Sequence, residues 1–289
     1  MQANIQWYPG HMARTKRELR QALAVVDIVL EIRDARIPVS SHNVDLANLV
    51  ANKPVITVLA KADLAERELT EAWVKTLRGA GLATVAVDLR GGRGLAELER
   101  IIKSLHGVNR ERLRERGRQD PGLRGVVVGV PNVGKSTLIN RLAKRNVVRT
   151  GAKPGVTRGK QWVRAGAFMQ LLDVPGVLWP KFDDPATGFK LAVTGAISDD
   201  VFDYIEVSAV LAEHIVKINP QTLPARYGVD SHLEQGMPIL QAIGKQRGFL
   251  LTGARVDEEK AAALLLREFR QGVLGPFTLE KPPVLSGSE

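Results

Sequence analysis

The stretch "LRGVVVGVPNVGKST" (residues 123–137) decides the fold class of this 289-residue chain. Its first half is apolar and β-branched, as in a buried strand. Its second half matches G-x-x-x-x-G-K-[ST] from Gly129 to Ser136, a phosphate-binding loop when a helix follows. Backbone N–H groups surround phosphates in such a loop, and the helix start adds partial positive charge. A turn without a ligand is the alternative, which this context disfavours. The stretch predicts a nucleoside triphosphate site, with Lys135 on the β- and γ-phosphates and Ser136 on Mg²⁺.

Further apolar runs that end at loops lie on both sides of this stretch, and helical patterns separate them. Strands that alternate with helices indicate an open, mostly parallel sheet that is covered on both faces. The fold class expected is therefore α/β. The expected elements are strands within 25–36, 54–63 and 82–92, helices within 65–81 and 94–107, a charged connector at 108–122 and a strand hairpin within 161–176.

The pattern changes near residue 180. Beyond it the sequence has long helical patterns, such as 199–218 and 257–275, and few strand signals. We expect an α/β domain over residues 1–180, which begins with a short arm at 1–24. A smaller all-α domain over 181–289 should follow it.

Composition and charge restrict the class of protein. Hydrophobic residues make up 44% and charged residues 25% of the chain, as in ordinary globular proteins. Cysteine is absent, which suits a reducing compartment. The sequence starts without the pattern of a signal peptide and has no apolar stretch near the ~20 residues of a membrane span. We expect a soluble, cytoplasmic protein that does not bind membranes.

The net charge is distributed unevenly. Residues 1–180 hold 30 basic and 16 acidic side chains, a net of +14, whereas residues 181–289 hold 11 and 15, a net of −4. No acidic residue occurs between Thr137 and Leu172. A charge run is often only a solvated face, but a run of one sign this long favours a polyanion such as nucleic acid. The candidates for RNA contact are Arg141, Lys144, Arg145, Arg149 and Lys153.

Two further loops fit the phosphate site. Asp173-Val-Pro-Gly176 ends the last expected strand, where Asp173 would hold Mg²⁺ through water and the Gly176 N–H would meet the γ-phosphate. In "TGAKPGVTRGK" (150–160) Thr157 is the favoured threonine for sensing Mg²⁺, and Thr150 is the weaker alternative.

Lys61-Ala62-Asp63 follows the strand-like run "PVITVLA" and predicts a base-reading loop. An aspartate there can accept both the N1–H and the exocyclic amine of guanine, a pair of donors that adenine lacks. The stem of Lys61 can pack over the ring. A capping aspartate is the alternative, but the phosphate loop favours a guanine site.

The base-reading loop precedes the phosphate loop, which rotates the usual order of GTPase motifs. The segments "WYPGHM" (7–12), "DARIPVSSHN" (34–43) and "GVPNVGKST" (129–137), in this order, resemble the circularly permuted ribosome biogenesis GTPase A family, including its mitochondrial relatives. The resemblance extends over the whole chain and is least distinctive in the C-terminal helical region.

The resemblance implies a P-loop GTPase fold and a cytoplasmic enzyme that binds GTP and hydrolyses it to GDP and phosphate. It implies an assembly factor for the large ribosomal subunit that binds rRNA in a nucleotide-dependent way. The residues it implies for nucleotide binding are Ala60, Lys61, Ala62, Asp63, Asp88, Leu89, Asn132, Val133, Gly134, Lys135, Ser136, Thr137 and Gly176.

The resemblance also assigns a cation and a catalytic group. Asn132 matches the family asparagine that helps to bind K⁺, and His11 matches the histidine proposed to be catalytic. Capping of the following helix is the alternative role for His11. The family usually has asparagine where this chain has Ala60, so one hydrogen bond near the base is lost and guanine affinity is expected to fall.

Two other classes of function stay open at this point. One is a nucleotide-gated RNA-binding scaffold with negligible turnover, because Val177 follows Gly176 where many GTPases carry a water-orienting glutamine. The other is a P-loop ATPase or kinase, which would leave Lys61 and Asp63 unexplained. In "EIRDARIP" Asp34 and Arg36 are expected to brace a strand end rather than to act in catalysis.

Overall fold

A computed structural model describes residues 12–50, 52–148, 161–174 and 184–283, and for 12–16 the backbone alone. The chain divides into two compact units. Among the described residues, an α/β unit contains 12–174 together with 278–283, and a helical unit contains 184–277. Each unit is described by itself.

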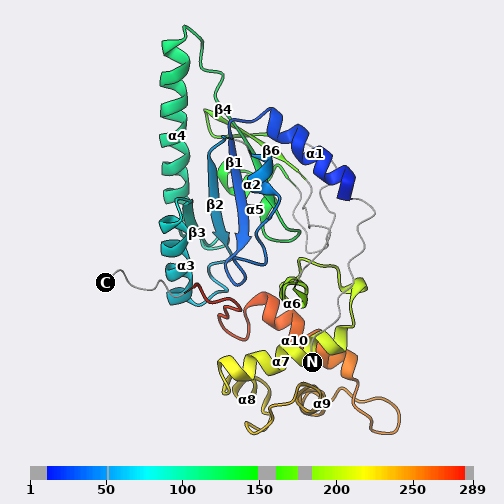
Figure 1. Cartoon of the computed structure of the whole chain (residues 1–289). Coiled ribbons are helices and arrows are strands. Elements are labelled where there is room, and N and C mark those ends of the chain that lie inside the picture. Colours follow the sequence, from blue (N-terminus) through cyan, green and yellow to red (C-terminus); the bar gives the residue numbers. More distant parts are fainter. Residues whose placement is uncertain (1–11, 51, 149–160, 175–183, 284–289) are drawn as a thin grey trace. The chain divides into compact units, whose positions relative to one another are not determined.

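The α/β unit is built on one mostly parallel sheet, as expected (Figure 1). Its order in space is β3-β2-β1-β4-β6-β5, and only β5 is antiparallel to its neighbour. The central strand β1 is buried along its whole length, in accordance with an apolar run between two parallel neighbours. The strands are β1 (Ile28–Asp34), β2 (Val55–Ala60), β3 (Ala83–Val87), β4 (Leu123–Gly129), β5 (Gln161–Ala165) and β6 (Met169–Asp173).

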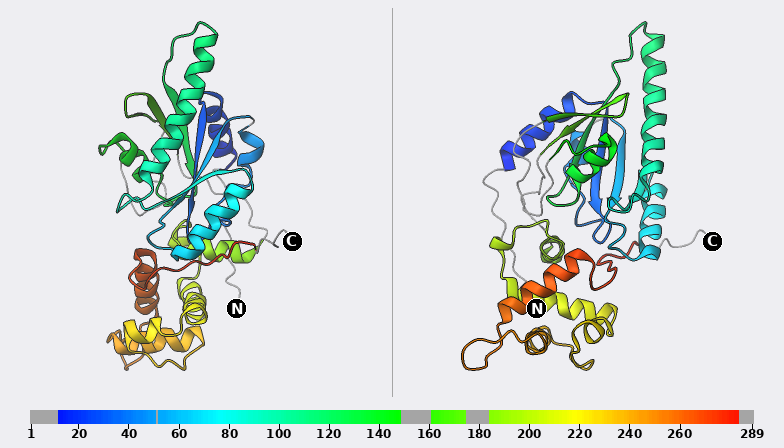
Figure 2. Two further views of the ribbon diagram at one scale, coloured as in Figure 1. Left: turned by 90° about the vertical axis from the view of Figure 1, so that its left-hand side faces the viewer. Right: turned by 180° about the vertical axis from the view of Figure 1, so that it is seen from behind.

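Helices cover both faces of this sheet. Helices α1 and α4 lie on opposite sides of it in all the views (Figures 1 and 2). The apolar face of α3 packs on Leu59 of β2 through Trp73 and Leu77. The helices of the unit are α1 (Met12–Ala24), α2 (Leu46–Leu49), α3 (Arg67–Gly79), α4 (Leu95–Glu115) and α5 (Lys135–Ala143).

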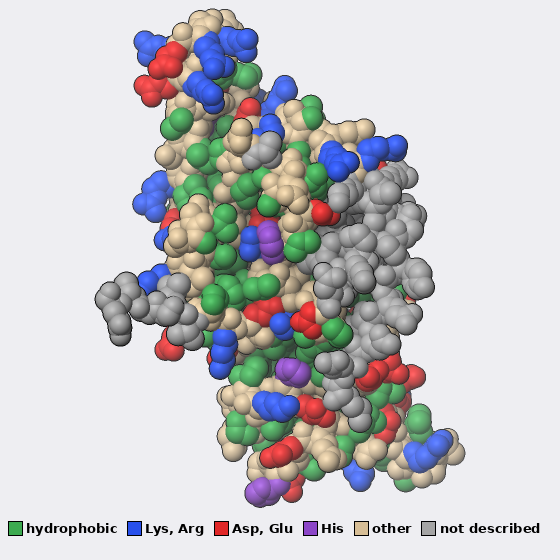
Figure 3. Space-filling model, in the orientation of Figure 1, with side chains coloured by type: hydrophobic (Ala, Val, Ile, Leu, Met, Phe, Trp, Pro, Cys, Tyr) green, Lys and Arg blue, Asp and Glu red, His purple; other side chains and the backbone are tan. Residues whose placement is uncertain are grey.

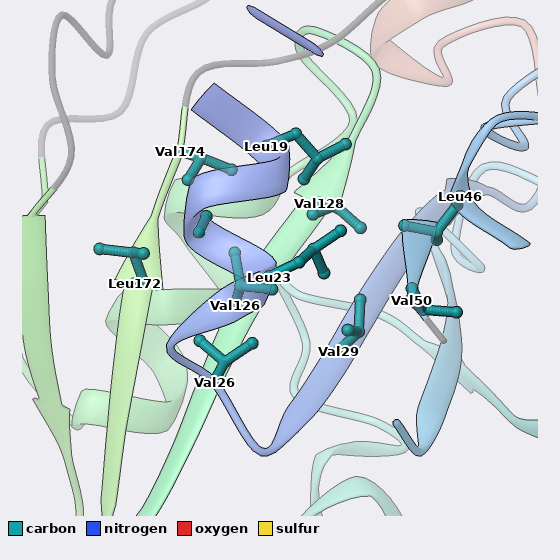
Figure 4. Packing of buried hydrophobic residues seen from close by; sticks show 11 residues of the cluster. Leu19, Leu23, Val26, Val29, Leu46, Val50, Val126, Val128, Leu172 and Val174 are labelled. Carbon is teal, nitrogen blue, oxygen red and sulfur yellow. The ribbon is translucent and has the colours of Figure 1, made fainter. Parts of the chain in front are cut away.

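Residues 12–24 form a core helix, which corrects the expected N-terminal arm at 1–24. Leu19 and Leu23 of α1 pack against Val126 and Val128 of β4 (Figure 4). Their spacing of four residues places both on one helix face, and burying such side chains stabilises a fold by about 1.5–3 kcal/mol each. The arm that was expected is therefore part of the hydrophobic core from Leu19 onward.

The first part of the expected connector at 108–122 is helical, because α4 continues through Glu115. Its buried residues, Leu98 and Ile102, lie in the first half, so the second half extends past the sheet (Figure 1). Basic side chains gather over that far end (Figure 3). The exposed arginines there are Arg110, Arg112, Arg114, Arg116 and Arg118.

The helical unit is all-α apart from one isolated bridge within its described residues, Leu250 with Val256. Buried residues of α7 form its centre, packed with α9 and α10. Aspartates cap three of its helices by accepting from backbone N–H groups. Its helices are α6 (Pro185–Val193), α7 (Tyr204–Ile218), α8 (Thr222–Tyr227), α9 (Gly236–Gln246) and α10 (Glu258–Gln271), with a short 3-10 helix at Asp199–Val201.

The end of the chain leaves this unit. Residues 278–283 belong with the α/β unit, whereas the sequence assigned everything after 180 to one helical domain. The reason is a set of hydrogen bonds to residues between Arg36 and Trp73, such as the one from the Trp73 indole to the Glu280 carbonyl (2.8 Å). None of the described helices is long and apolar enough to cross a membrane.

Candidate nucleotide-binding site

The predicted loops meet at one edge of the sheet. They follow β2, β3, β4 and β6, which run in the same direction, so their carboxyl ends lie on the same side. Open α/β sheets bind ligands outside the carboxyl ends of their strands. The sheet therefore brings the base-reading loop and the phosphate loop together, although about 70 residues of sequence separate them.

The phosphate loop depends on backbone conformations that bulky residues avoid. Gly129 passes so close to β1 that a Cβ atom would lie 2.4 Å from the Ile32 carbonyl oxygen. Gly134 has φ +114° and is the N-cap of α5, and Asn132 has φ +56°. These turns direct the chain into α5, whose first residue is Lys135, and leave the helix start facing the loop.

Lys135 and Asp173 form the charged centre of the site. The Lys135 ammonium group is buried and donates to the carbonyls of Val130 (2.9 Å) and Gly129 (3.2 Å). Burial lowers the pKa of Lys135 to about 8, and the nearby Asp173 carboxylate opposes that shift. Burial also raises the pKa of Asp173 to about 6, against the effect of Lys135.

Asp173 is 1% exposed, and neither carboxylate oxygen has a hydrogen-bond partner within the described residues. An orphaned buried carboxylate is costly unless a cation or a water satisfies it. Carboxylate and hydroxyl oxygens are the ligands that Mg²⁺ prefers, so the site fits this ion. Within the described ranges no cluster of three His, Cys, Asp or Glu could hold a metal, so the phosphates of a nucleotide would have to complete such a site.

Ion pairs to the end of β1 hold the base-reading loop. Lys61 adopts φ +59°, and its ammonium group lies 3.0 Å from Asp34 Oδ2 at the end of β1. The Arg36 guanidinium donates to both oxygens of Asp34 (3.0 and 2.8 Å). Burial alone would raise the pKa of Asp34, but Arg36 and Lys61 hold it far below its usual range. Asp34 and Arg36 therefore brace the loop, in accordance with the favoured expectation.

Asp63 differs from its neighbours. It is exposed and makes no hydrogen bond or ion pair among the described residues. Ala60 is fully buried at the end of β2, between Asp34 of β1 and Val87 of β3, so its methyl group can supply no hydrogen bond to the loop. Because Asp63 is exposed and no described residue pairs with it, its carboxylate is available to a ligand.

The second base loop contacts the phosphate loop, which the sequence did not indicate. The Asp88 carboxylate accepts from the N–H groups of Arg90 and Gly91 (2.8 Å each), and this fixes the turn. Leu89 approaches Gly134 so closely that a Cβ atom there would lie 2.9 Å from its Cδ1 atom. Leu89 and Gly134 are far apart in the sequence, so no local sequence pattern indicates that they are in contact.

Arg141 of α5 donates to the carbonyls of Leu89 (2.7 Å) and Arg90. This candidate for RNA contact therefore braces the second base loop with two of its five N–H donors. Lys144 and Arg145 are exposed after the last turn of α5. Other predicted residues lie outside the described residues, namely His11, Arg149, Lys153, Thr157 and Gly176.

A buried cluster in β1 was also missed by the sequence analysis. Glu31 accepts from Arg33 (2.7 and 2.9 Å) and from the Asn43 N–H (3.1 Å), and it lies 2.7 Å from His42 Nδ1. Burial opposes ionisation, but His42 and Arg33 lower the pKa of Glu31. Charged residues within an otherwise apolar strand were the available signal.

The chain is similar to known GTPases. Residues 124–224 match the family model described as 50S ribosome-binding GTPase. The chain is 41% identical to Ribosome biogenesis GTPase A of Priestia megaterium (96% of this chain, 97% of the relative) and 40% identical to that of Bacillus cereus (96% and 94%). Among solved structures, GNP-bound YlqF from T. maritima superposes with a TM-score of 0.63 at 25% identity, over 93% of this chain and 99% of that one.

The fold and the loops at its edge define a P-loop GTPase whose motifs run in a circularly permuted order. This confirms the predicted fold class and GTPase activity. The chain belongs to the ribosome biogenesis GTPase A family, as the resemblance predicted.

Proposed function

We propose that this GTPase is a cytoplasmic assembly factor that binds the rRNA of the large ribosomal subunit in a nucleotide-dependent way. One observation carries the nucleotide part of this proposal: the loop with the available Asp63 carboxylate lies at the same sheet edge as the phosphate loop. The names of the relatives and the excess of positive charge before residue 181 support the ribosomal part.

Each loop has a role in nucleotide binding. Asp63 would accept from guanine, the stem of Lys61 would cover the ring, and the Asp88–Leu89 backbone would contact the base from the second loop. The N–H groups of Asn132 to Thr137 and the Lys135 ammonium would bind the phosphates. Gly176 would contact the γ-phosphate.

Mg²⁺ would be held by Ser136, by Asp173 through water, and by Thr157. When bound, it would neutralise charge on the β- and γ-phosphates. The orphaned Asp173 oxygens support this assignment. Asn132 would help to hold K⁺ beside the phosphates, as the family resemblance implies.

In hydrolysis, water attacks the γ-phosphorus, the bond to the β–γ bridging oxygen breaks, and GDP and phosphate leave. His11 would orient that water by accepting a hydrogen bond from it, a role that a neutral imidazole can fill near pH 7. Val177 stands where a glutamine often does this, so we expect slow turnover that the ribosomal subunit stimulates.

The test measures binding of GTP and ATP, and GTP hydrolysis with and without purified large subunits, for the parent and His11→Ala. We expect preference for GTP, stimulated turnover in the parent, and loss of most stimulation in the variant with GTP affinity retained. Equal affinity for ATP would contradict the guanine site. Negligible turnover on the subunit would favour the scaffold, and full stimulation of His11→Ala would exclude His11 as the catalytic group.

A further inference from the structure

Residues Thr278–Glu280, which we call the C-terminal strap, lie on the α/β unit although they follow the last helix of the helical unit in sequence. Seven N–H or O–H groups of described residues make the hydrogen bonds that hold the strap. They reach two segments that flank the base-reading loop in sequence, residues 36–40 and residues 66–73, which include the N-cap and the first half of α3.

The first attachment is a buried carboxylate. Glu280 is 6% exposed and accepts from the N–H groups of Val39 (2.6 Å) and Ser40 (3.1 Å), and from the Ser40 hydroxyl. Hydrogen bonds to a charged acceptor are roughly twice as strong as neutral ones. One side chain therefore fixes the loop that follows Arg36.

Backbone groups make the second attachment. The Leu279 N–H donates to the Arg36 carbonyl (2.8 Å), and the Trp73 indole N–H donates to the Glu280 carbonyl (2.8 Å). Trp73 is itself buried against Leu59 and Ala62, so the strap is joined to the core beneath the base-reading loop.

The third attachment completes the start of α3. Thr278 Oγ accepts from the N–H of Glu66 (3.0 Å), the N-cap residue, and the Thr278 N–H donates to the Glu66 carboxylate (3.2 Å). This reciprocal pair resembles one half of a capping box, because a threonine side chain accepts from the N–H of the N-cap residue, although the two residues are 212 positions apart.

These attachments surround Lys61-Ala62-Asp63 from both ends. Glu66 lies three residues after Asp63 in the chain. On the other side, Arg36 holds Asp34, which pairs with Lys61. We propose that the C-terminal strap is a positioning element for guanine recognition. This rests on the proposed role of Asp63.

The test compares GDP with IDP, whose hypoxanthine lacks the exocyclic amine that Asp63 would accept from. The ratio of the two affinities reports the placement of Asp63, whereas a general loss of stability or of phosphate contacts lowers both affinities alike. Glu280→Ala and Thr278→Ala remove attachments, and Glu280→Gln retains an acceptor for Val39 and Ser40. Lys281→Ala is the control, because Lys281 is exposed beside the strap.

We expect Glu280→Ala to lower the ratio of GDP affinity to IDP affinity by roughly threefold to tenfold. Thr278→Ala should lower this ratio less, and Glu280→Gln should lower it less than Glu280→Ala does. Lys281→Ala should match the parent. If Glu280→Ala does not fold, Ser40→Ala removes one of the same hydrogen bonds and should narrow the ratio in the same direction. If the parent prefers GDP to IDP and the folded variants keep the same ratio of the two affinities, the strap proposal is wrong and the guanine assignment stands. A parent that binds GDP and IDP equally would contradict the guanine assignment, and the strap proposal with it.

Discussion

Asp34 and Asp63 lie near the ends of neighbouring strands and have opposite surroundings. Asp34 is 2% exposed and contacts two cations, whereas Asp63 is exposed with no partner among the described residues. A buried, paired carboxylate serves the structure, whereas an exposed carboxylate without a partner can accept from a ligand, which is the role that we propose for Asp63. Both residues are aspartates, so the difference between their roles comes from their surroundings alone.

Asp63→Asn should weaken GDP binding by about tenfold to a hundredfold, because an amide cannot accept from both donors of guanine. It should also favour XDP, since the xanthine carbonyl accepts where guanine donates. Competition against a labelled nucleotide measures both. Glu68→Gln, an exposed neutralisation on α3, is the control. A variant that keeps the parent's preference for GDP would contradict the role of Asp63.

Asp34→Asn should lower the free energy of unfolding by about 3 kcal/mol near pH 7, because the buried Arg36 would lose the counter-charge of Asp34. The pKa of Asp34 is lowered in the folded state, so its contribution is present above about pH 4 and is lost as the pH falls below that value. The difference from the parent should therefore shrink between about pH 5 and pH 3. Urea unfolding across this range measures it, and a difference that stays constant would contradict the assignment.

At the scale of elements, α4 shows how one residue type is required at one position and only tolerated at another. Gly94 is its N-cap with φ +84°, and a Cβ atom there would lie 2.1 Å from the Ala86 carbonyl oxygen. A Cβ atom on Gly107, within the same helix, would meet nothing within 4 Å. The first glycine lets the end of the second base loop pass close to β3 before α4 starts.

Gly94→Ala should lower the free energy of unfolding by about 2–4 kcal/mol through backbone strain and the clash with β3. Gly107→Ala is the matched control and should raise it by about 0.5–1 kcal/mol, because alanine favours the helix. Thermal or urea unfolding of both variants measures the effect. If both variants changed the free energy of unfolding in the same direction, this account would be contradicted.

At the scale of the whole molecule, charge divides at about residue 180, with a net of +14 before it and −4 after it. Phosphate contacts release counterions, so binding that uses basic side chains weakens steeply with salt. Arg141 also holds the second base loop, so its replacement would disturb that loop. Lys144 and Arg145 are exposed and make no side-chain hydrogen bond among the described residues, so they test phosphate contact more cleanly.

The double variant Lys144→Ala and Arg145→Ala should weaken binding to the large subunit and reduce the slope of log K against log salt by about one per lost phosphate contact. The matched control is Lys217→Ala with Arg255→Ala, two exposed cations of the helical unit. Binding measured between low and physiological salt gives both slopes. An unchanged slope would place the contact elsewhere, with the exposed arginines at the far end of α4 as the next set to test.

The sequence by itself determined the α/β sheet and the strand–loop–helix of the phosphate loop, and it located the loop that we propose reads the base. These features are local: a β-branched run, a glycine spacing or a charged strand end constrains the backbone within a few residues. The permuted order of the loops could also be read directly along the chain. Parallel strands then place all of these loops at one edge, whatever their order in sequence.

Only the tertiary structure decided which side chains hold that site together. The pairing of Lys61 with Asp34, the contact of Arg141 with Leu89, and the strap from Thr278 to Glu280 each join residues that have no local relation. For the same reason Leu19 and Leu23 proved to be core residues, and the end of the chain returned to the α/β unit. Such contacts depend on which surfaces are buried against each other, and the free energy of that burial belongs to the packed molecule as a whole.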